Sequence, residues 1–505
     1  MFRIPSVSSQ PLIGDMNWVY IQTQTSAGRV IDFGVSSLSV VSLDPNKLPM
    51  AAVLPLVREA GSLTSVAVSL QTKNEIPDGG FVVLRFPQNL TLLQPSLYGH
   101  FEGFDGMLQL EPPDGNCTMG CQVRIRVSGS YIPSGRQISF IINNVKNMPQ
   151  SGVTGSYFLQ TTTADGIVID EGSSAGTLIE PSRLGFVSVS CQEPCVMETT
   201  VTLTISFATS NHLMRGSVVE LTFPPEIMLA ETCNDNCENI TVQGDGISIV
   251  AVSLQENSLI LLNDQNLNGG DQVTFDLSGV SAPKRTGRTG RFQIRTKIGD
   301  STVDEDVNIS GFYVDSRTLS AEVSCDDNVA AKKANYSFHL RFVSSLPINS
   351  TTIALTLPDG VQTDPTSSIK VTSEFEGTID ASVQGQTFRL SFPVVDRRYL
   401  ELSAISFSLS DLQNPPVSGV FEFLFETVVS DAVLGTSYTA DQGSASLQIS
   451  PEELQDVKIL PDMISIGFEG AVTIQMTTLL PLPSNFTTRI SFPSFFGISH
   501  ITSVR

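Results

Sequence analysis

The sequence has few of the residues that usually carry out chemistry. It contains four histidines in 505 residues, and charged residues make up 16% of the chain. No nucleophile elbow, metal-ligand pair or glycine-rich phosphate loop is present. The histidines share no common spacing, and they are His100, His212, His339 and His500. An enzyme is therefore the least favoured class of function, and we predict no catalytic residue and no cofactor.

Positive charge and long apolar runs are also scarce. The net charge of −22 would repel phosphate, which argues against nucleic acid or anionic membranes as main partners. No apolar run approaches the roughly 20 residues of a membrane helix, because the longest candidate, residues 48–57, contains Pro49 and Pro55. The first residues lack the pattern of a signal peptide. We expect no membrane span in this chain, and a processed or excised piece if the protein is secreted.

Two sequence markers recur with a period of about 135 residues. The first is a Phe-Pro step or its equivalent, at Phe86-Pro87, Phe223-Pro224, Leu357-Pro358 and Phe492-Pro493. The second is a Pro or Ser between units, at Pro45, Pro181, Ser316 and Pro451. This period is longer than that of solenoid repeats, so each unit should be a complete domain in a tandem array. The hydrophobic content of 41% is enough for a packed core in each unit.

Strict alternation of apolar and polar residues predicts half-buried β-strands at matching places in each unit. The predicted core positions are Val66-Val68-Leu70, Val201-Leu203-Ile205-Phe207 and Val472-Ile474-Met476; Val82-Leu84-Phe86, Val219-Leu221-Phe223, Ile353-Leu355-Leu357 and Ile490-Phe492; Ile138-Phe140-Ile142, Val273-Phe275-Leu277 and Ile405-Phe407-Leu409; and Val19-Ile21, Tyr157-Leu159, Phe292-Ile294 and Phe423-Phe425. A shared inward phase is what a buried sheet face requires.

These patterns predict an all-β protein of tandem Ig-like antiparallel β-sandwich domains in a rod-like array. We expect complete domains at 46–181, 182–316 and 317–451. Residues 1–45 match the last third of a unit, since Pro11, Thr23, Gly28 and Asp32 align with Pro149, Thr161, Gly166 and Asp170 at an offset of 138. Residues 452–505 match the first part of one. Both are therefore predicted to be partial sandwiches.

The strand that ends in Phe-Pro, the strand at 272–280, the Pro turn and the strand at 290–296 together resemble repeats of very large surface proteins of protists and algae. The resemblance implies a role in extracellular fibres, mastigoneme-like appendages or cell coats. Our leading hypothesis is a structural subunit of a glycosylated fibre or coat that assembles with its own copies, head to tail, by strand or half-domain complementation. The alternative is the stalk of an adhesin or receptor ectodomain, with the aromatic-rich, Gly-bearing segment at 97–107 as a sugar-binding loop or as packing over a sheet edge.

Six of the seven cysteines form pairs with the same spacing: Cys117/Cys121, Cys191/Cys195 and Cys233/Cys237. We predict disulfides that each pin a turn, worth about 2 kcal/mol for so small a loop. Zinc, free thiols and cross-pairing between 191/195 and 233/237 are the alternatives. Cys325 occupies the position of Cys191 one unit later, where Val329 replaces the partner, and is read as a buried relic or as a link to another chain.

Seven Asn-x-Ser/Thr sequons predict N-linked glycans on exposed loops: Asn89, Asn116, Asn239, Asn308, Asn335, Asn349 and Asn485. Together with the predicted disulfides they favour an extracellular or cell-surface location in a eukaryote.

Two charged clusters have alternative interpretations. An Asp follows the repeated Thr in each unit, and further acidic residues lie near the domain junctions, so that either solvated turns or calcium sites are expected. These residues are Asp165, Asp300, Asp431, Asp170-Glu171 and Asp304-Glu305-Asp306. A basic patch is read as a mobile loop and strand edge, or as a docking site for an acidic subunit surface or a sulfated glycan. It comprises Lys284, Arg285, Arg288, Arg291 and Arg295.

Overall fold

The computed structural model describes most of the 505-residue chain. The described residues are 3–7, 10–11, 13–102, 105–111, 120–192, 194–229, 239–244, 246–253, 256–347, 350–363, 371–373, 377–395, 401–431, 435–463, 465–467, 469–482 and 484–497. The chain divides into two compact units. The first comprises Met1–Cys195, Thr199–Pro283 and Arg288–Tyr313, and the second comprises Val196–Glu198, Lys284–Gly287 and Val314–Arg505.

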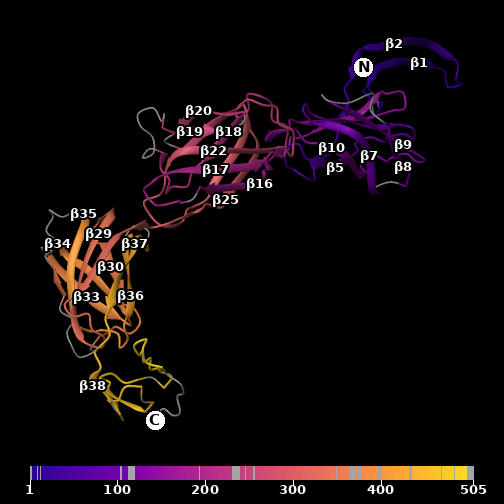
Figure 1. The fold of residues 1–505 in the computed structure, drawn as a ribbon. Coiled ribbons are helices and arrows are strands. Elements are labelled where there is room, and N and C mark those ends of the chain that lie inside the picture. Colours follow the sequence, from indigo (N-terminus) through magenta and orange to yellow (C-terminus); the bar gives the residue numbers. More distant parts are fainter. Residues whose placement is uncertain are drawn as a thin grey trace. The chain divides into compact units, whose positions relative to one another are not determined.

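The elements whose bounds are described are all β-strands, so the prediction of an all-β protein is confirmed (Figure 1). In the described residues, no helical segment has the length and hydropathy to cross a bilayer. Most strands belong to three two-sheet sandwiches, each with a six-stranded and a smaller sheet.

The first sandwich lies in the first unit. Its four-stranded sheet has the order β4 (Met50–Pro55), β5 (Leu63–Gln71), β10 (Gln137–Lys146), β7 (Thr91–Glu102). Its six-stranded sheet has the order β3 (Asn46–Lys47), β13 (Val168–Ser174), β12 (Tyr157–Thr162), β6 (Phe81–Arg85), β9 (Gln122–Ser128), β8 (Met107–Glu111), and β11 (Gly152–Val153) pairs with β14 (Leu178–Ile179).

The second sandwich repeats this order. Its sheets are β16 (Gly185–Cys191), β17 (Thr200–Ala208), β22 (Gln272–Ser281), β19 (Thr241–Gln243); and β15 (Ser182–Arg183), β25 (Ser301–Ile309), β24 (Phe292–Ile298), β18 (Val218–Thr222), β21 (Ser258–Asn263), β20 (Ile247–Ser253). The short strands β23 (Gly287–Arg288) and β26 (Tyr313–Val314) follow the pattern of β11 and β14.

The third sandwich lies in the second unit. Its sheets are β28 (Ser320–Cys325), β29 (Lys333–Pro347), β35 (Glu401–Gln413), with β31 (Gln362–Thr363) and β32 (Val371–Ser373) both on β35; and β27 (Arg317–Thr318), β37 (Thr436–Ile449), β36 (Gly419–Asp431), β30 (Thr351–Thr356), β34 (Thr387–Val395), β33 (Gly377–Gln384).

The strand order explains why the sequence repeat predicts an Ig-like domain. In the first sandwich, β4-β5-β10-β7 matches the A-B-E-D sheet of an Ig domain and β13-β12-β6 matches the G-F-C sheet. The hairpin β8-β9 extends the second sheet beside β6. The same order in the other two sandwiches confirms the Ig-like prediction.

The predicted inward phase of the strands is confirmed in the three sandwiches, whereas the predicted core positions Val19, Ile21 and Val472 in the flanking segments are exposed. Alternate residues of β5 and β17 are buried, as a sheet packed on one face requires. The first core joins the inner faces of both sheets, including Val68 of β5, Leu84 of β6 and Leu159 of β12, all at most 1% exposed. Residues 490–492 differ from the prediction, because they lie outside any strand and Ile490 is exposed. A strand needs a neighbour to bond its backbone, and no neighbour is described for this segment.

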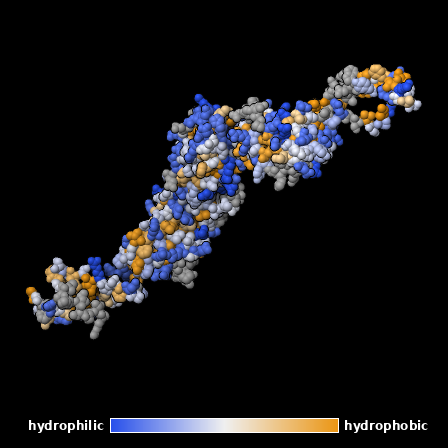
Figure 2. All heavy atoms as spheres, turned by 90° about the vertical axis from the view of Figure 1, so that its right-hand side faces the viewer, coloured by the Kyte–Doolittle hydropathy of each residue, from blue (hydrophilic) through white to orange (hydrophobic). Residues whose placement is uncertain are grey.

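Two hairpins flank the sandwiches. β1 (Gly14–Gln24) pairs with β2 (Val30–Leu43), and β38 (Gln455–Pro461) pairs with β39 (Val472–Thr477). Hydrophobic atoms are exposed over the N-terminal hairpin, at the upper right of Figure 2. A lone hairpin buries little apolar surface, so its stability depends on what packs against it.

Candidate functional site: carboxylate pins, clasp loops and free strand edges

A buried aspartate recurs at the same place in all three sandwiches. Asp170 of β13, Asp304 of β25 and Asp441 of β37 are each 0% exposed. The backbone N–H of each donates to the Oγ1 of a buried threonine on the neighbouring strand, at 3.1, 3.0 and 2.7 Å. These threonines are Thr161, Thr296 and Thr427. We call each Thr–Asp pair a carboxylate pin.

Each pin binds the chain at the end of the second strand of the smaller sheet: just after β5 and β17 in the first two sandwiches, and within β29 in the third. In the first sandwich, the N–H groups of Lys73 and Asn74 donate to one carboxylate oxygen of Asp170, and the Asn74 Nδ2 donates to the other at 2.7 Å. Ser210 and Asn211 make the same three bonds to Asp304. In the third sandwich, the N–H and Oγ of Ser344 donate to Asp441. The pins therefore connect the two sheets through charge-assisted hydrogen bonds.

Burial sets the protonation behaviour of two pins. Desolvation raises the pKa of Asp304 above its ordinary value, and the donors on Asn211 and Ser210 partly oppose this. Desolvation likewise raises the pKa of Asp441, against the hydrogen bonds from Ser344. The charged carboxylate is costly to bury here, but its donors would be equally costly to leave without an acceptor.

The predicted acidic turns are thus of two kinds. Asp165 and Asp300 are exposed, as expected for solvated turns, and nothing is described for the side chain of Asp431. Asp170 and Asp304 are not solvated, so that interpretation is wrong for them. Their oxygens face N–H donors rather than other carboxylates, which does not suit calcium. Within the described residues, no group of three or more His, Cys, Asp or Glu could hold a metal.

A second device holds the loop after the first strand of each smaller sheet, at residues 55–60, 191–197 and 325–330, which we call the clasp loop. In the first sandwich, the buried Asn147 donates its Nδ2 to the carbonyls of Val57 and Glu59, both at 2.9 Å. In the third, Asn414 donates in the same way to Asp327 and Val329, at 2.9 and 2.7 Å. The clasp loop also pairs with the last residues of its sandwich, at Glu59–Glu180, Val196–Asp315 and Val329–Ser450.

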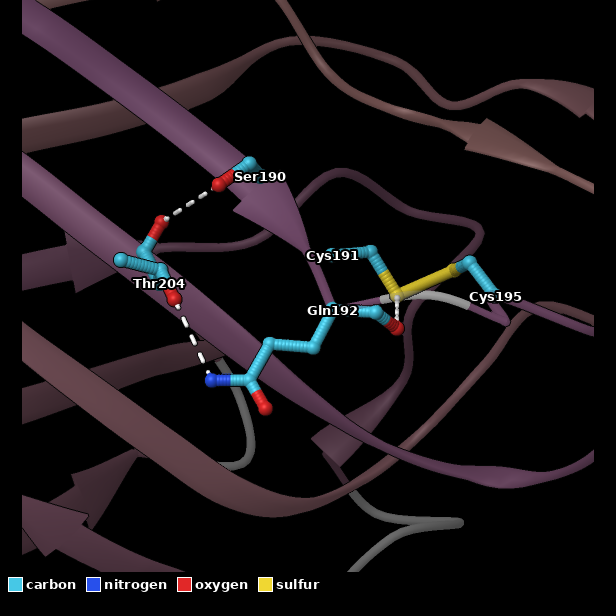
Figure 3. The surroundings of a disulfide bond; sticks show 5 residues. All are labelled: Ser190, Cys191, Gln192, Cys195 and Thr204. Carbon is cyan, nitrogen blue, oxygen red and sulfur yellow. Dashed lines mark hydrogen bonds between the residues drawn. A yellow bond between two sulfur atoms is a disulfide. The ribbon is translucent and has the colours of Figure 1, made fainter.

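The second sandwich replaces this amide by a covalent bond. Ala282 occupies the position that Asn147 has in the first sandwich and Asn414 in the third. In each sandwich the backbone N–H of this residue donates to the turn after the clasp loop: Ala282 to Thr199, Asn147 to Ser62 and Asn414 to Lys332. Here Cys191 and Cys195 form a disulfide with Cα atoms 6.0 Å apart (Figure 3). The Gln192 Nε2 donates to Thr204 Oγ1 at 3.5 Å beside it. The disulfide therefore closes the one clasp loop of the three that has no asparagine amide at this position.

The other cysteines are only partly described. Cys121 is disulfide-bonded, whereas Cys117, Cys233 and Cys237 lie outside the described residues. Cys325 is a free thiol at the end of β28, half-buried, and its Sγ donates to the Asp327 carbonyl. Burial, together with the charges of Asp326 and Asp327, raises the pKa of this thiol. A raised pKa makes the thiol less reactive.

One pin has a further contact within the first unit. The Nδ2 of Asn211, oriented by Asp304, also donates to the Ala60 carbonyl at 3.1 Å. The Oγ of Ser182 donates to the same carbonyl. Asn211 is buried, and its Nδ2 donates one amide hydrogen to Asp304 and the other to the Ala60 carbonyl. This network joins the clasp loop of the first sandwich to the pin of the second.

Gly61 lies where a side chain would collide with this network. Its φ is +63°, and a Cβ there would overlap the Oδ1 of Asn211. We expect Gly61→Ala to lower the stability of the first unit by about 2 kcal/mol or more, because strain adds to the loss of the Asn211 bonds. Calorimetry of the whole chain, with hydrogen exchange at the peptide containing Asn211, measures both effects. Gly129→Ala is the control: its φ is +83° but nothing lies within 4 Å. Equal losses in the two variants would contradict the role of Asn211.

The residues of the predicted basic patch are divided between the two units. Arg295 bonds Glu305 at 3.1 Å, and Arg291 donates to the Asn308 Oδ1 at 2.7 Å. Lys284 and Arg285 belong to the second unit, and the other three to the first. Arg288 lies in β23 and is exposed. The guanidinium groups of Arg291 and Arg295 are therefore engaged within the second sandwich.

The described sequons are all exposed, at Asn89, Asn239, Asn308, Asn335 and Asn485. Asn89 has a positive φ of 75° in the turn after Phe86-Pro87. The Asn335 Nδ2 donates to Asp326 at 2.7 Å, and the Asn239 Nδ2 donates to the Gly279 carbonyl at 3.5 Å. The backbone N–H of Asn335 also donates to Asp326, and the two bonds from Asn335 lower the pKa of Asp326. Asn116 and Asn349 lie outside the described residues.

The aromatic segment at 97–107 is not a loop over most of its length. Residues 97–102 lie in β7 and Met107 begins β8, while Phe104 is outside the described residues. Tyr98 is 69% exposed on this edge strand. The prediction of a Gly-bearing binding loop is therefore wrong for 97–102, and Tyr98 is exposed rather than packed over the sheet edge.

The N-terminal hairpin carries an exposed copy of the pin. Thr23 Oγ1 donates to Asp32 at 3.2 Å, and the Asp32 N–H donates back to the same oxygen. Thr23 and Asp32 stand opposite each other in β1 and β2, as Thr161 and Asp170 do in β12 and β13. β1 and β2 are therefore the equivalents of β12 and β13. Among the described residues, β1 has no strand on its other edge, where β12 has β6.

Comparison with known proteins adds little. No family model matches the chain, and no curated protein matches it. Among solved structures, BslA, a bacterial hydrophobin, is 15% identical with a TM-score of 0.19, covering 27% of this chain and 98% of its own. The C-terminal domain of the Streptococcus pyogenes antigen I/II-family protein AspA is 9% identical with a TM-score of 0.19, covering 54% and 96%. A putative membrane anchored protein from Corynebacterium diphtheriae is 11% identical with a TM-score of 0.18, covering 86% and 98%. Similarity this low carries no functional argument.

Proposed function

We propose that this chain is a structural subunit of an extracellular, glycosylated fibre or cell coat. Its building blocks are the units at 46–181, 182–316 and 317–451. The observation that carries the proposal is that all three sandwiches share the same two structural features. Each sandwich keeps a carboxylate pin and a held clasp loop, which are devices for a rigid fold. An array that repeats mechanical devices suits a load-bearing or scaffolding role.

The location rests on disulfide chemistry and on the sequons. A disulfide closes the second clasp loop, and disulfides persist in oxidising compartments. Asn89 is exposed in a turn and Asn308 is exposed near the end of β25, where a glycan can be accommodated. The surface charge of −22 supports solubility and gives no reason for nucleic acid as a partner.

Copies of the chain are proposed to join head to tail. The hairpins at 14–43 and 455–477 resemble separate parts of one sandwich, and both expose apolar side chains. Completion of a sandwich by the hairpins of two copies would cover these side chains and pair free strand edges. The alternative function is the stalk of an adhesin or receptor ectodomain, and the exposed Tyr98 on an edge strand is the observation that favours it.

Electron microscopy of the purified chain at rising concentration tests the proposal. Filaments with an axial repeat of a few sandwiches are expected, with mass growing in light scattering. Single particles of monomer mass at every concentration would overturn head-to-tail assembly. The stalk alternative would then lead, and a glycan-binding screen would follow.

A further inference from the structure

Among the described residues, the edge of β1 away from β2 pairs with no strand. Its equivalents β12, β24 and β36 each pair antiparallel, on the edge away from the next strand of the chain, with the strand that precedes the Phe-Pro step. Those partners are β6, β18 and β30. The three sandwiches agree on the register, with Leu159 opposite Leu84, Ile294 opposite Leu221 and Phe425 opposite Leu355.

The side chains of β1 match a face that is buried elsewhere. Ile21 corresponds to Leu159, Ile294 and Phe425, which are all 0% exposed, yet Ile21 is 65% exposed. Val19 corresponds to Tyr157, Phe292 and Phe423, also 0% exposed, yet it is 42% exposed. The hairpin therefore presents both an unpaired edge and an uncovered core face.

A matching strand lies unused at the other end of the chain. Residues 487–493 align with β6 and the Phe-Pro step that follows it, and they form no strand. Ile490 stands where Leu84, Leu221 and Leu355 are 0% exposed, but it is 51% exposed. In a complete sandwich, the equivalents of β1 and of residues 487–493 cover each other. In this chain each of these two segments leaves exposed the surface that its equivalent buries against the other.

We propose that residues 487–491 of a second copy add to the free edge of β1 as an antiparallel strand. The register of the three sandwiches puts Ile21 opposite Ile490 and Tyr20 opposite Ser491. This inference rests on the proposed head-to-tail assembly and names its joint. Backbone hydrogen bonds supply the affinity, and the burial of Ile21 and Ile490 supplies the specificity.

Engineered cysteines test the register. A Tyr20→Cys chain and a Ser491→Cys chain, both also carrying Cys325→Ser, are mixed and oxidised. We expect a covalent 1:1 dimer, because directly opposed Cβ atoms lie about 4.5–5.5 Å apart. The matched control pairs Tyr20→Cys with Thr487→Cys, on the same face but about 13 Å away along the strand. Cross-linking as efficient in the control as in the test pair would overturn the register.

Charged substitutions test the joint itself. Ile21→Asp and Ile490→Asp replace exposed side chains, so each chain should fold normally, yet each should raise the concentration needed for assembly at least about 100-fold. A mixture of the two retains one intact head and one intact tail, so it should stop at a dimer. If the unmodified chain assembles and either variant assembles equally well, the joint is wrong and the proposed function stands. If the unmodified chain stays monomeric, head-to-tail assembly itself fails.

Discussion

In the Asp304→Ala variant, the second sandwich is expected to unfold about 10 °C below that of the unmodified chain. The substitution leaves the N–H groups of Ser210 and Asn211 without their buried acceptor, which costs about 3 kcal/mol in total. Calorimetry of the whole chain measures the shift. Hydrogen exchange of the peptides from β17 and β25 assigns it to this sandwich, since a chain of several domains does not unfold in one step.

Asp32→Ala is the matched control for this loss. The Asp32 N–H donates to the Thr23 Oγ1, as in the buried pins, and the Thr23 hydroxyl donates to the Asp32 carboxylate, but both residues are exposed. Water replaces the bond to the carboxylate when that group is removed, so no measurable change is expected. An Asp304→Ala chain as stable as the Asp32→Ala chain would show that the pin does not hold the sheets together.

The pH dependence of the Asp304→Ala loss follows from the pKa of the pin. Burial raises the pKa of Asp304 in the folded state above the ordinary value of about 3.9. A raised carboxyl pKa means that the folded state binds the proton more tightly than the unfolded state. The stability that Asp304 contributes is therefore complete below the ordinary pKa and falls as the pH rises through the raised value. The deficit of the Ala variant should be larger near pH 4 than near pH 7.

The fold was predictable because strand phase depends on side chains alone. The alternation at Val201, Leu203 and Ile205 predicts one buried face, and these residues are at most 6% exposed. What alternation cannot show is whether a strand finds a neighbour. Ile490 and Phe492 have the same pattern as β6, yet their segment forms no strand, because pairing depends on another segment rather than on the segment itself.

The pins and clasps were harder to predict because spacing and identity both vary. Thr161 and Asp170 are nine residues apart, as are Thr23 and Asp32, but Asp441 follows Thr427 by fourteen because its hairpin is longer. An alignment at constant offset therefore misses Asp441. The asparagines that hold the clasp loops could not be predicted from the sequence, for another reason. Ala282 interrupts the series, and only the disulfide beside it shows that the same loop is held by different chemistry.

The second prediction with a large expected effect concerns the two ways in which a clasp loop is held, by an asparagine amide or by a disulfide. Asn147→Ala removes both donors to the carbonyls of Val57 and Glu59 and should destabilise the first sandwich by about 2 kcal/mol. The double variant Cys191→Ser with Cys195→Ser should destabilise the second sandwich by a similar amount, about 2 kcal/mol for so short a loop. Each loss should appear in calorimetry as a shift confined to one sandwich, and in hydrogen exchange as faster exchange of that clasp loop.

Adding Ala282→Asn to the double serine variant is the decisive step. Asn at this position has the backbone setting of Asn147 and Asn414, so its Nδ2 should bond the clasp loop and recover about half of the lost stability. In the chain that keeps its disulfide, the loop is already closed, and Ala282→Asn should give little gain. Recovery only without the disulfide would establish that the two clasps substitute for each other. Equal effects of Ala282→Asn in both backgrounds would mean that the amide and the disulfide act on different parts of the structure. The three sandwiches would then share the clasp loop but not the interaction that holds it.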